Sequence, residues 1–182
     1  MKKIIFTLMA LIVGFTFTSC SDDDWSTDSS LDHDYFYGFN DWGKFKNDVV
    51  FQIANGETAT IATHFWSERP QKGINAEVAY YTVSDDLTLG VDFQVVDDDG
   101  NALTPDSDGG YKVVWENCTK GDKNINIKAL SSKKGNVIIT TWNPRRTGDD
   151  AISFTNTYIV KTEKYSVRAF TENYKVTVKM NH

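Results

Sequence analysis

The chain lacks the motifs that would point directly to catalysis. Its three histidines, His33, His64 and His182, are scattered, and none has a second metal-ligating residue at a suitable spacing. The sequence contains neither a Gly-x-Ser-x-Gly nucleophile motif nor a phosphate-binding loop. We therefore expect a protein that is not an enzyme and needs no cofactor. A hydrolase would require two carboxylates that meet in a cleft.

Basic residues are outnumbered by acidic ones. Lys and Arg number 19, Asp and Glu number 25, and the formal net charge is −6. Binding to nucleic acid depends on basic side chains that face phosphates, and electrostatic docking on anionic lipid depends on the same charges. The acidic balance therefore argues against both kinds of partner.

No apolar run is long enough to span a bilayer. The longest one, residues 4–17, has fourteen residues without a charge and follows Lys2 and Lys3. A spanning helix needs about 20 apolar residues. A short basic start, an apolar stretch and small residues before a cleavage point are typical of a secretory signal. Residues 1–19 are therefore predicted to be a signal peptide.

A cysteine stands directly after that cleavage point, in Thr18-Ser19-Cys20. The arrangement resembles the lipobox of bacterial lipoproteins, although that family prefers Leu where this chain has Phe17. The resemblance implies that Cys20 is lipidated and anchors the chain through its acyl chains. An ordinary cleaved signal peptide, with Cys20 incidental, is the alternative. Lipidation would leave Cys118 without a disulfide partner, and we expect it to be a small buried residue.

An acidic run follows this cysteine. It consists of Ser21, Asp22, Asp23 and Asp24. The run is similar to the export signal that carries lipoproteins of Bacteroidota to the outer face of the outer membrane. The similarity implies a lipid-anchored protein of the outer membrane that faces the cell exterior. The alternative is the start of a solvated linker.

The remaining chain is long enough for one domain. Removal of residues 1–19 leaves 163 residues, which can bury a real core. Residues 20–47 begin Ser- and Asp-rich, as is typical of a flexible tether. Their end is dense in aromatic residues, and we expect it to pack on the domain as an irregular edge. The domain itself is predicted over residues 48–182.

Most of that domain alternates apolar and polar residues with a period of two. Such runs predict half-buried strands, and in one of them the pattern points Trp115 inward. Turn signals such as Asn55-Gly56 and Asp99-Gly100 separate the runs, and no stretch has a helical period with caps. Many short strands at near-even spacing indicate an all-β sandwich or barrel.

One part of the chain resembles a known family. Gly90-Val91-Asp92-Phe93 precedes a strand that ends at Trp115, and Lys123-Asn124-Ile125-Asn126-Ile127 follows a glycine turn. This order resembles the Calx-beta type of immunoglobulin-like domain over residues 48–142. The resemblance implies an immunoglobulin-like antiparallel β-sandwich of about 7–10 strands.

The same family often binds calcium through acidic residues after the last of these strands. Here Lys133 and Lys134 stand in that place, so we expect added calcium to stabilise the chain little. Acidic residues gather elsewhere, in turn-forming sequences that we interpret as hairpin turns. The alternative is a surface ion site made by Asp97, Asp99, Asp106 and Asp108.

Aromatic residues are the remaining candidates for a binding site. Trp66, Tyr81 and Trp142 fall on strand faces opposite the expected core or at strand ends. Exposed rings can stack on the apolar faces of sugars, whereas the alternative is that these side chains pack at strand ends. The leading hypothesis is a surface-anchored, non-catalytic lipoprotein that captures an extracellular glycan. Its alternative is a protein-interaction or adhesion subunit of a cell-surface assembly.

Overall fold

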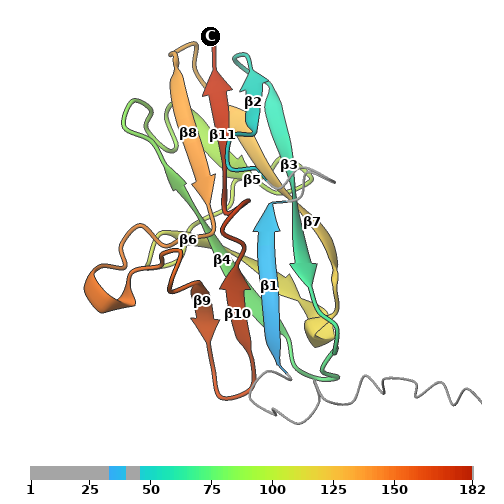
Figure 1. The fold of residues 1–182 in the computed structure, drawn as a ribbon. Helices are drawn as coiled ribbons and strands as arrows, with labels where there is room; N and C mark the ends of the chain where they lie inside the picture. Colours follow the sequence, from blue (N-terminus) through green and yellow to red (C-terminus); the bar gives the residue numbers. More distant parts are fainter. Residues whose placement is uncertain (1–32, 40–45, 182) are drawn as a thin grey trace, which may run out of the picture.

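The structure is a computed structural model that describes residues 33–39 and 46–181. These residues form eleven strands and two short 3-10 helices, and the strands build two sheets that share one hydrophobic core (Figure 1). Within these ranges there is no α-helix, and no helical segment has the length and apolar character needed to cross a membrane. The predicted all-β sandwich is confirmed.

The two sheets contain six and five strands. The first has the order β5-β7-β3-β1-β10-β9 and the second has the order β2-β11-β8-β4-β6. The first sheet consists of β1 (Asp34–Phe39), β3 (Thr58–Trp66), β5 (Phe93–Val96), β7 (Gly121–Ala129), β9 (Tyr158–Lys161) and β10 (Ser166–Ala169). The second consists of β2 (Val50–Ile53), β4 (Ala76–Val83), β6 (Gly110–Trp115), β8 (Gly135–Thr140) and β11 (Lys175–Met180). The 3-10 helices are η2 (Glu116–Cys118) and η3 (Gly148–Asp150).

Most strand pairs are antiparallel, as predicted, but two are parallel, so both sheets are mixed. β1 runs parallel to β10, and β2 runs parallel to β11. In each case a strand from the start of the domain lies beside a strand from its end. Local turn signals specify hairpins between consecutive strands, but they carry no information about such long-range neighbours. The direction of these two pairs is therefore a tertiary property.

β1 also corrects the predicted start of the domain. The aromatic stretch does pack on the domain, but as an inner strand between β3 and β10 instead of an irregular edge. Its alternation buries the side chains of Tyr35, Tyr37 and Phe39. The sandwich thus starts at residue 34 and not at residue 48. The predicted signal peptide, Cys20 and the acidic run at residues 21–24 lie outside the described residues.

The centre of the core contains the tryptophan that the sequence pattern points inward. Trp115 is only 2% exposed, which confirms its predicted orientation. Its ring stacks on Phe65, with centroids 5.3 Å apart and planes at 12°, and meets the ring of Tyr37 edge-on at 6.3 Å. Because Phe65 and Tyr37 belong to the other sheet, Trp115 bridges the two layers.

Candidate functional site

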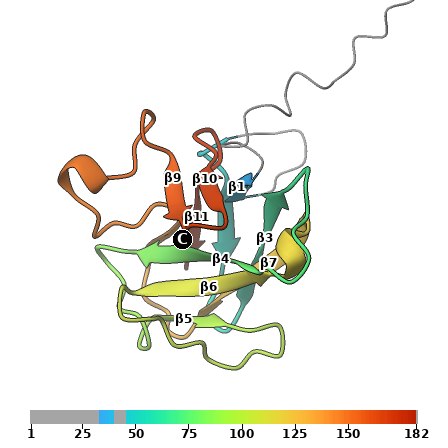
Figure 2. The same cartoon turned by 90° about the horizontal axis from the view of Figure 1, so that it is seen from below.

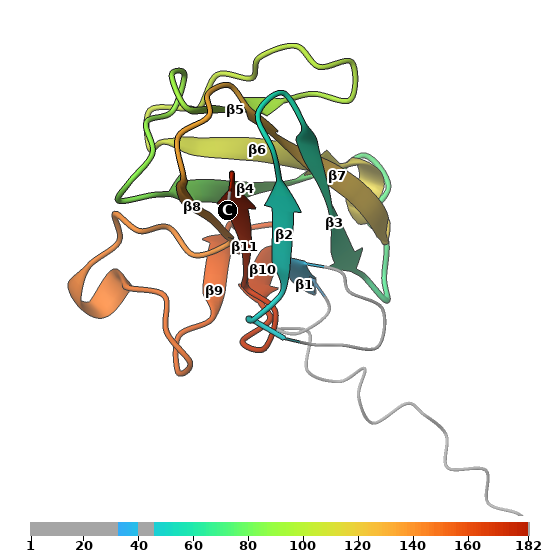
Figure 3. The ribbon, with the colours of Figure 1, turned by 90° about the horizontal axis from the view of Figure 1, so that it is seen from above.

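The site with the most convergent polar groups is a pocket on the outer side of β4. One wall is the outward face of β4 and β6, and the other is a long segment between β8 and β10 that we call the arm (residues 143–165). Seen from either end, the arm projects beside β4 (Figures 2 and 3). The pocket has a volume of about 330 Å³, which is at the lower end of the range for ligand sites.

The floor of the pocket follows from the alternation along β4. Val78 and Tyr80 point into the core, so Glu77, Ala79 and Tyr81 point the other way. Tyr81 lies against the backbone of Gly110 in β6, where a Cβ atom would come within 3.0 Å of the tyrosine ring. A glycine at this position therefore makes the room that the ring occupies.

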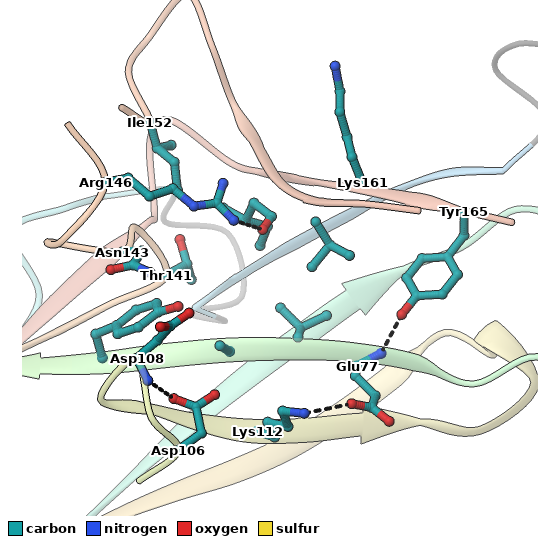
Figure 4. Close-up of a pocket in the computed structure, with 15 residues that line it drawn as sticks. Glu77, Asp106, Asp108, Lys112, Thr141, Asn143, Arg146, Ile152, Lys161 and Tyr165 are labelled. Carbon is teal, nitrogen blue, oxygen red and sulfur yellow. Dashed lines mark hydrogen bonds and ion pairs between the residues drawn. The ribbon is translucent and has the colours of Figure 1, made fainter. Parts of the chain in front are cut away.

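The arm is fixed near its start by hydrogen bonds within itself, to β9, and at its end by a hydrogen bond to β4. Near its start, the Arg146 guanidinium donates to the carbonyl oxygens of Tyr158 at 3.2 Å and Ile159 at 3.0 Å. At its end, the Tyr165 hydroxyl accepts the backbone N–H of Glu77 at 3.0 Å, as Figure 4 shows. The Tyr165 contact holds the end of the arm against β4, and the Arg146 contacts fix the start of the arm against β9.

Charges of both signs line the pocket in equal number. The acidic residues are Glu77, Asp106 and Asp108, and the basic residues are Lys112, Arg146 and Lys161. Several are already engaged: the Lys112 ammonium lies 3.0 Å from the Glu77 carboxylate, and Asp106 accepts the N–H groups of Asp108 and Gly110, each at 2.9 Å. The site therefore has no strong preference for a ligand of one charge.

One buried hydroxyl in the lining has no hydrogen-bond partner. Thr141 is 1% exposed, and within the described part of the chain nothing bonds to its Oγ1. Asn143, the first residue of the arm, also lines the pocket (Figure 4). Burial raises the pKa of the Tyr81 phenol, against the opposing effect of nearby Arg146, so Tyr81 stays protonated and can donate a hydrogen bond. An unpaired buried hydroxyl is costly, and it is the kind of group that a ligand can satisfy.

The three aromatic candidates lie at three separate places. Tyr81 is in the pocket. Trp66, the last residue of β3, lies on the outer face of the other sheet between the rings of His64 at 4.1 Å and Phe170 at 4.4 Å. Trp142 follows β8 and stacks on Tyr174, with centroids 3.8 Å apart. The structure thus does not assemble Trp66, Tyr81 and Trp142 into one platform.

The acidic candidates are also separated. Asp106 and Asp108 line the pocket, whereas Asp97 belongs to the turn after β5 and accepts N–H groups of Asp99 and Asn101 within that turn. Among residues 33–39 and 46–181, no group of three or more His, Cys, Asp or Glu side chains is arranged to hold a metal ion.

At the place where the Calx-beta resemblance locates calcium ligands, a lysine contacts a carboxylate. The Lys133 ammonium lies 3.5 Å from Asp92, which also accepts the N–H of Thr88 at 2.9 Å and the hydroxyl of Ser131 at 2.8 Å. These contacts, the Thr88 N–H first, hold the pKa of Asp92 below its usual range. The positive charge beside the Asp92 carboxylate is therefore the Lys133 ammonium, at the place where the resemblance would put a calcium ion.

The remaining residues with reactive side chains are not in the pocket. His64 bonds to Asp122 on the outer face of the first sheet. Cys118 is a free, buried thiol whose Sγ lies 3.4 Å from the carbonyl oxygen of Ile74, and burial raises its pKa. A buried thiol with a raised pKa is a poor nucleophile.

Sequence reasoning missed several pocket residues because they lie in the arm or next to it. Asn143 and Arg146 are in a segment without periodicity, at Asn143-Pro144, which signals only a turn, and Thr141 ends an alternating run that predicts a strand. No local pattern indicates that this segment folds back over β4. A count of the residues between the predicted strands would have shown an unusually long connection, which is where binding residues often occur.

Comparisons with known proteins give no family. No family model matches the chain and no curated protein sequence matches it. Among solved structures it is similar to a conjugative transposon lipoprotein from Bacteroides eggerthii, at 11% identity and a TM-score of 0.34, over 81% of this chain and 97% of that one. It is also similar to the third cohesin ScaC from Acetivibrio cellulolyticus, solved with the ScaB dockerin, at 11% identity and 0.35, over 81% and 99%. A PapD-like domain of human CEP192 matches at 11% and 0.28, over 79% and 84%. Similarities this low support no assignment of function.

Proposed function

We propose that this chain is a surface-anchored, non-catalytic module that binds a glycan in the pocket between β4, β6 and the arm. The observation that carries the proposal is the hydroxyl of Thr141, which is buried in the lining without a hydrogen-bond partner. A ligand that bonds to this group would remove the cost of leaving it unpaired.

The class of ligand follows from the mixture of groups around that hydroxyl. Sugar hydroxyls both donate and accept, so they require donors and acceptors in close alternation. Tyr81, Asn143 and Arg146 can donate, and Asp108 can accept, all within the same pocket. The equal number of acidic and basic residues favours a neutral ligand over a phosphate or a polyamine. The small volume fits one or two sugar units and not a long chain.

Binding without hydrolysis is favoured by the state of the carboxylates. Glycoside hydrolysis uses a pair of carboxyl groups that flank the bond to be broken. In this pocket Glu77 is paired with Lys112, and Asp106 is held by two backbone N–H groups. Of these three carboxylates, only that of Asp108 accepts no hydrogen bond from a described residue. The pocket therefore lacks the pair of available carboxyl groups.

The anchor belongs to the same proposal. Lipidation of Cys20 would attach the chain to the outer membrane, and the acidic run at residues 21–24 would direct it to the outside of the cell. A glycan-binding pocket is useful there because the ligand is extracellular. Cys20→Ser should move the protein from the membrane fraction to the soluble fraction. A variant that still needs detergent for extraction would contradict the anchor.

The pocket is tested by a pair of threonine variants on a glycan array. Thr141→Val removes the unpaired hydroxyl and keeps the shape, so it should leave the melting temperature unchanged or higher. It should also weaken glycan binding about tenfold, the loss of about one hydrogen bond. Thr177→Val is the matched control, because Thr177 is a half-buried residue of β11 outside the pocket.

The outcome distinguishes a binding site from a structural pocket. Glycan binding that falls with Thr141→Val and survives Thr177→Val supports the proposal. An array on which the chain binds nothing overturns it, and so does a glycan that both variants bind as well as the unmodified chain.

A further inference from the structure

β6 is an edge strand whose outer side faces an open groove. It pairs only with β4 among the described strands, and it ends the order of the second sheet. Seen from both ends, β5 of the first sheet lies beside it (Figures 2 and 3). The groove between these two edges has a volume of about 610 Å³ and runs along the middle of β6. It lies at the edge of the sandwich, whereas the glycan pocket lies on the outer face of β4.

The backbone groups of β6 that point into this groove can be identified from Gly110. Its N–H donates to the Asp106 carboxylate at 2.9 Å and its carbonyl accepts the N–H of Asp106 at 2.8 Å, so both groups point away from β4. In an antiparallel pair, residues alternate between facing the partner strand and facing away from it. The N–H and C=O of Lys112 and Val114 therefore also point away from β4.

The edge of β5, across the groove from β6, is already paired with another segment of the chain. Leu103 donates its N–H to the carbonyl of Val95 at 2.9 Å, and Ala102 forms an isolated bridge with Val96. The segment after β5 thus covers the free side of that strand, whereas among the described residues the outward backbone groups of β6 are covered only at Gly110, by Asp106. Exposed edges are commonly protected by lysines, but Lys112 is drawn to Glu77, with its ammonium 3.0 Å from that carboxylate.

The walls of the groove indicate the side chains that an added strand would carry. Its apolar part consists of Val96, Leu103, Val113 and Val114, and the side chains of Leu103 and Val114 are exposed. Three carboxylates and two lysines also line it: Asp97 accepts hydrogen bonds from Asn101, Asp98 accepts one from Asn126, and Asp122 bonds to His64. The partners of Asp97 and Asp98 are neutral amides, so these two negative charges remain available to a cation, although Lys112 and Lys123 line the same groove.

We infer that β6 accepts an extended segment of a partner protein as an additional strand of the second sheet. Main-chain hydrogen bonds to Lys112 and Val114 would provide the attachment, as in other cases of strand addition. Apolar side chains of the segment would fill the groove between Val96 and Val114. A basic side chain would meet Asp97 and Asp98. Lys112 lines both sites, but the inference uses the backbone edge of β6, whereas the glycan pocket uses its outer face.

A proline pair tests the backbone part of the inference. Val114→Pro removes the N–H that points into the groove, and an edge strand tolerates proline where that group faces away from the sheet. Gln52→Pro is the matched control at the opposite edge of the same sheet. There Val49 and Ile53 accept N–H groups of Thr177 and Asn181 on the β11 side, so the N–H of Gln52 faces away from β11.

The probe is a library of twelve-residue peptides displayed on phage and selected on the full chain in detergent. Enriched peptides should alternate apolar residues with basic or polar ones. Binding should fall at least tenfold with Val114→Pro and stay unchanged with Gln52→Pro. N-methylation of every second peptide amide should abolish binding for one of the two alternating sets of amides and leave it intact for the other set. A contact made only by side chains would show no such alternation.

Several results would overturn the inference. The inference fails if the selection enriches no peptide, or if both proline variants bind the peptides equally well. It also fails if the effect of N-methylation does not alternate along the peptide. Self-association of the chain that Val114→Pro abolishes would assign the edge to a second copy instead. The glycan pocket is tested separately, with Thr141→Val on the glycan array. If Val114→Pro loses peptide binding and retains glycan binding, the two sites are separate.

Discussion

The core around Trp115 and the arm around Trp142 use similar aromatic side chains in different surroundings. Trp115 is 2% exposed and is enclosed by rings from the opposite sheet. Trp142 is half-buried and stacks on Tyr174, and the ring beyond it, Phe154, is 68% exposed. The first group joins two sheets, whereas the second fixes a connecting segment beside the ends of β8 and β11. Aromatic content alone therefore does not distinguish the core from a segment that packs on the outside of the domain. Stability measurements can distinguish them.

The largest effect is expected in the core. Trp115→Ala removes a fully enclosed ring between the sheets and leaves a cavity, so unfolding should cost about 3–5 kcal/mol less. A domain of this size has about 5–15 kcal/mol of stability, so the variant should have a much lower denaturation midpoint. Chemical denaturation followed by tyrosine and tryptophan fluorescence measures the change. A silent substitution would show that Trp115 does not bridge the sheets.

A smaller effect is expected at the base of the arm. Trp142→Ala removes the stacking on Tyr174 from a half-buried position, which should lower stability by about 1–3 kcal/mol. The neighbouring Thr141 and Asn143 lie in the pocket, so glycan binding should weaken as well. Trp142→Phe is the control, because it keeps a ring at this position. If Trp142→Ala lowers stability more than Trp115→Ala, the assignment of Trp115 to the core and Trp142 to a peripheral contact is wrong.

The far end of the arm is expected to respond less. Tyr165→Phe removes the hydroxyl that accepts the N–H of Glu77, and this should cost about 0.5–1.5 kcal/mol. Hydrogen exchange at the Glu77 amide gives a direct measurement, because that proton loses its partner. An unchanged exchange rate would mean that the arm is not held to β4 at this point.

The smallest effect is expected at the tip of the aromatic group. Phe154 is largely exposed, so Phe154→Ala should change stability by no more than about 0.5 kcal/mol. Thermal unfolding of this variant beside Trp142→Ala measures how steeply the energetic importance of the rings declines along the arm. A loss as large as that of Trp142→Ala would place Phe154 in a packed interface.

Much of the fold could be predicted from particular residues. The alternation Tyr111, Val113, Trp115 assigned the inner face of β6 correctly, because the side-chain period of a strand is two. The same rule could have identified β1, since Tyr35, Tyr37 and Phe39 alternate as well. The aromatic composition of the stretch instead predicts only an irregular edge that packs on the domain. Composition outweighed periodicity there, and periodicity was the better guide.

The site was predictable only in part. Tyr81 was a candidate because its strand face was known, and the structure places it in the pocket. Trp66 and Trp142 are candidates because they fall on such a face or at a strand end, but their rings are covered by His64, Phe170 and Tyr174. Strand alternation reveals which side of a sheet a residue faces. It does not reveal whether another segment covers that side.

The sequence by itself determined the strand faces, the all-β class and the features that predict export and lipidation, because each depends on residues close together in the chain. Only the tertiary structure decided that β1 pairs with β10, that β2 pairs with β11, and that the arm folds over β4. These contacts join residues more than a hundred positions apart, or close an irregular loop. Their free energy comes from burial and hydrogen bonds shared by distant segments, which no local pattern encodes.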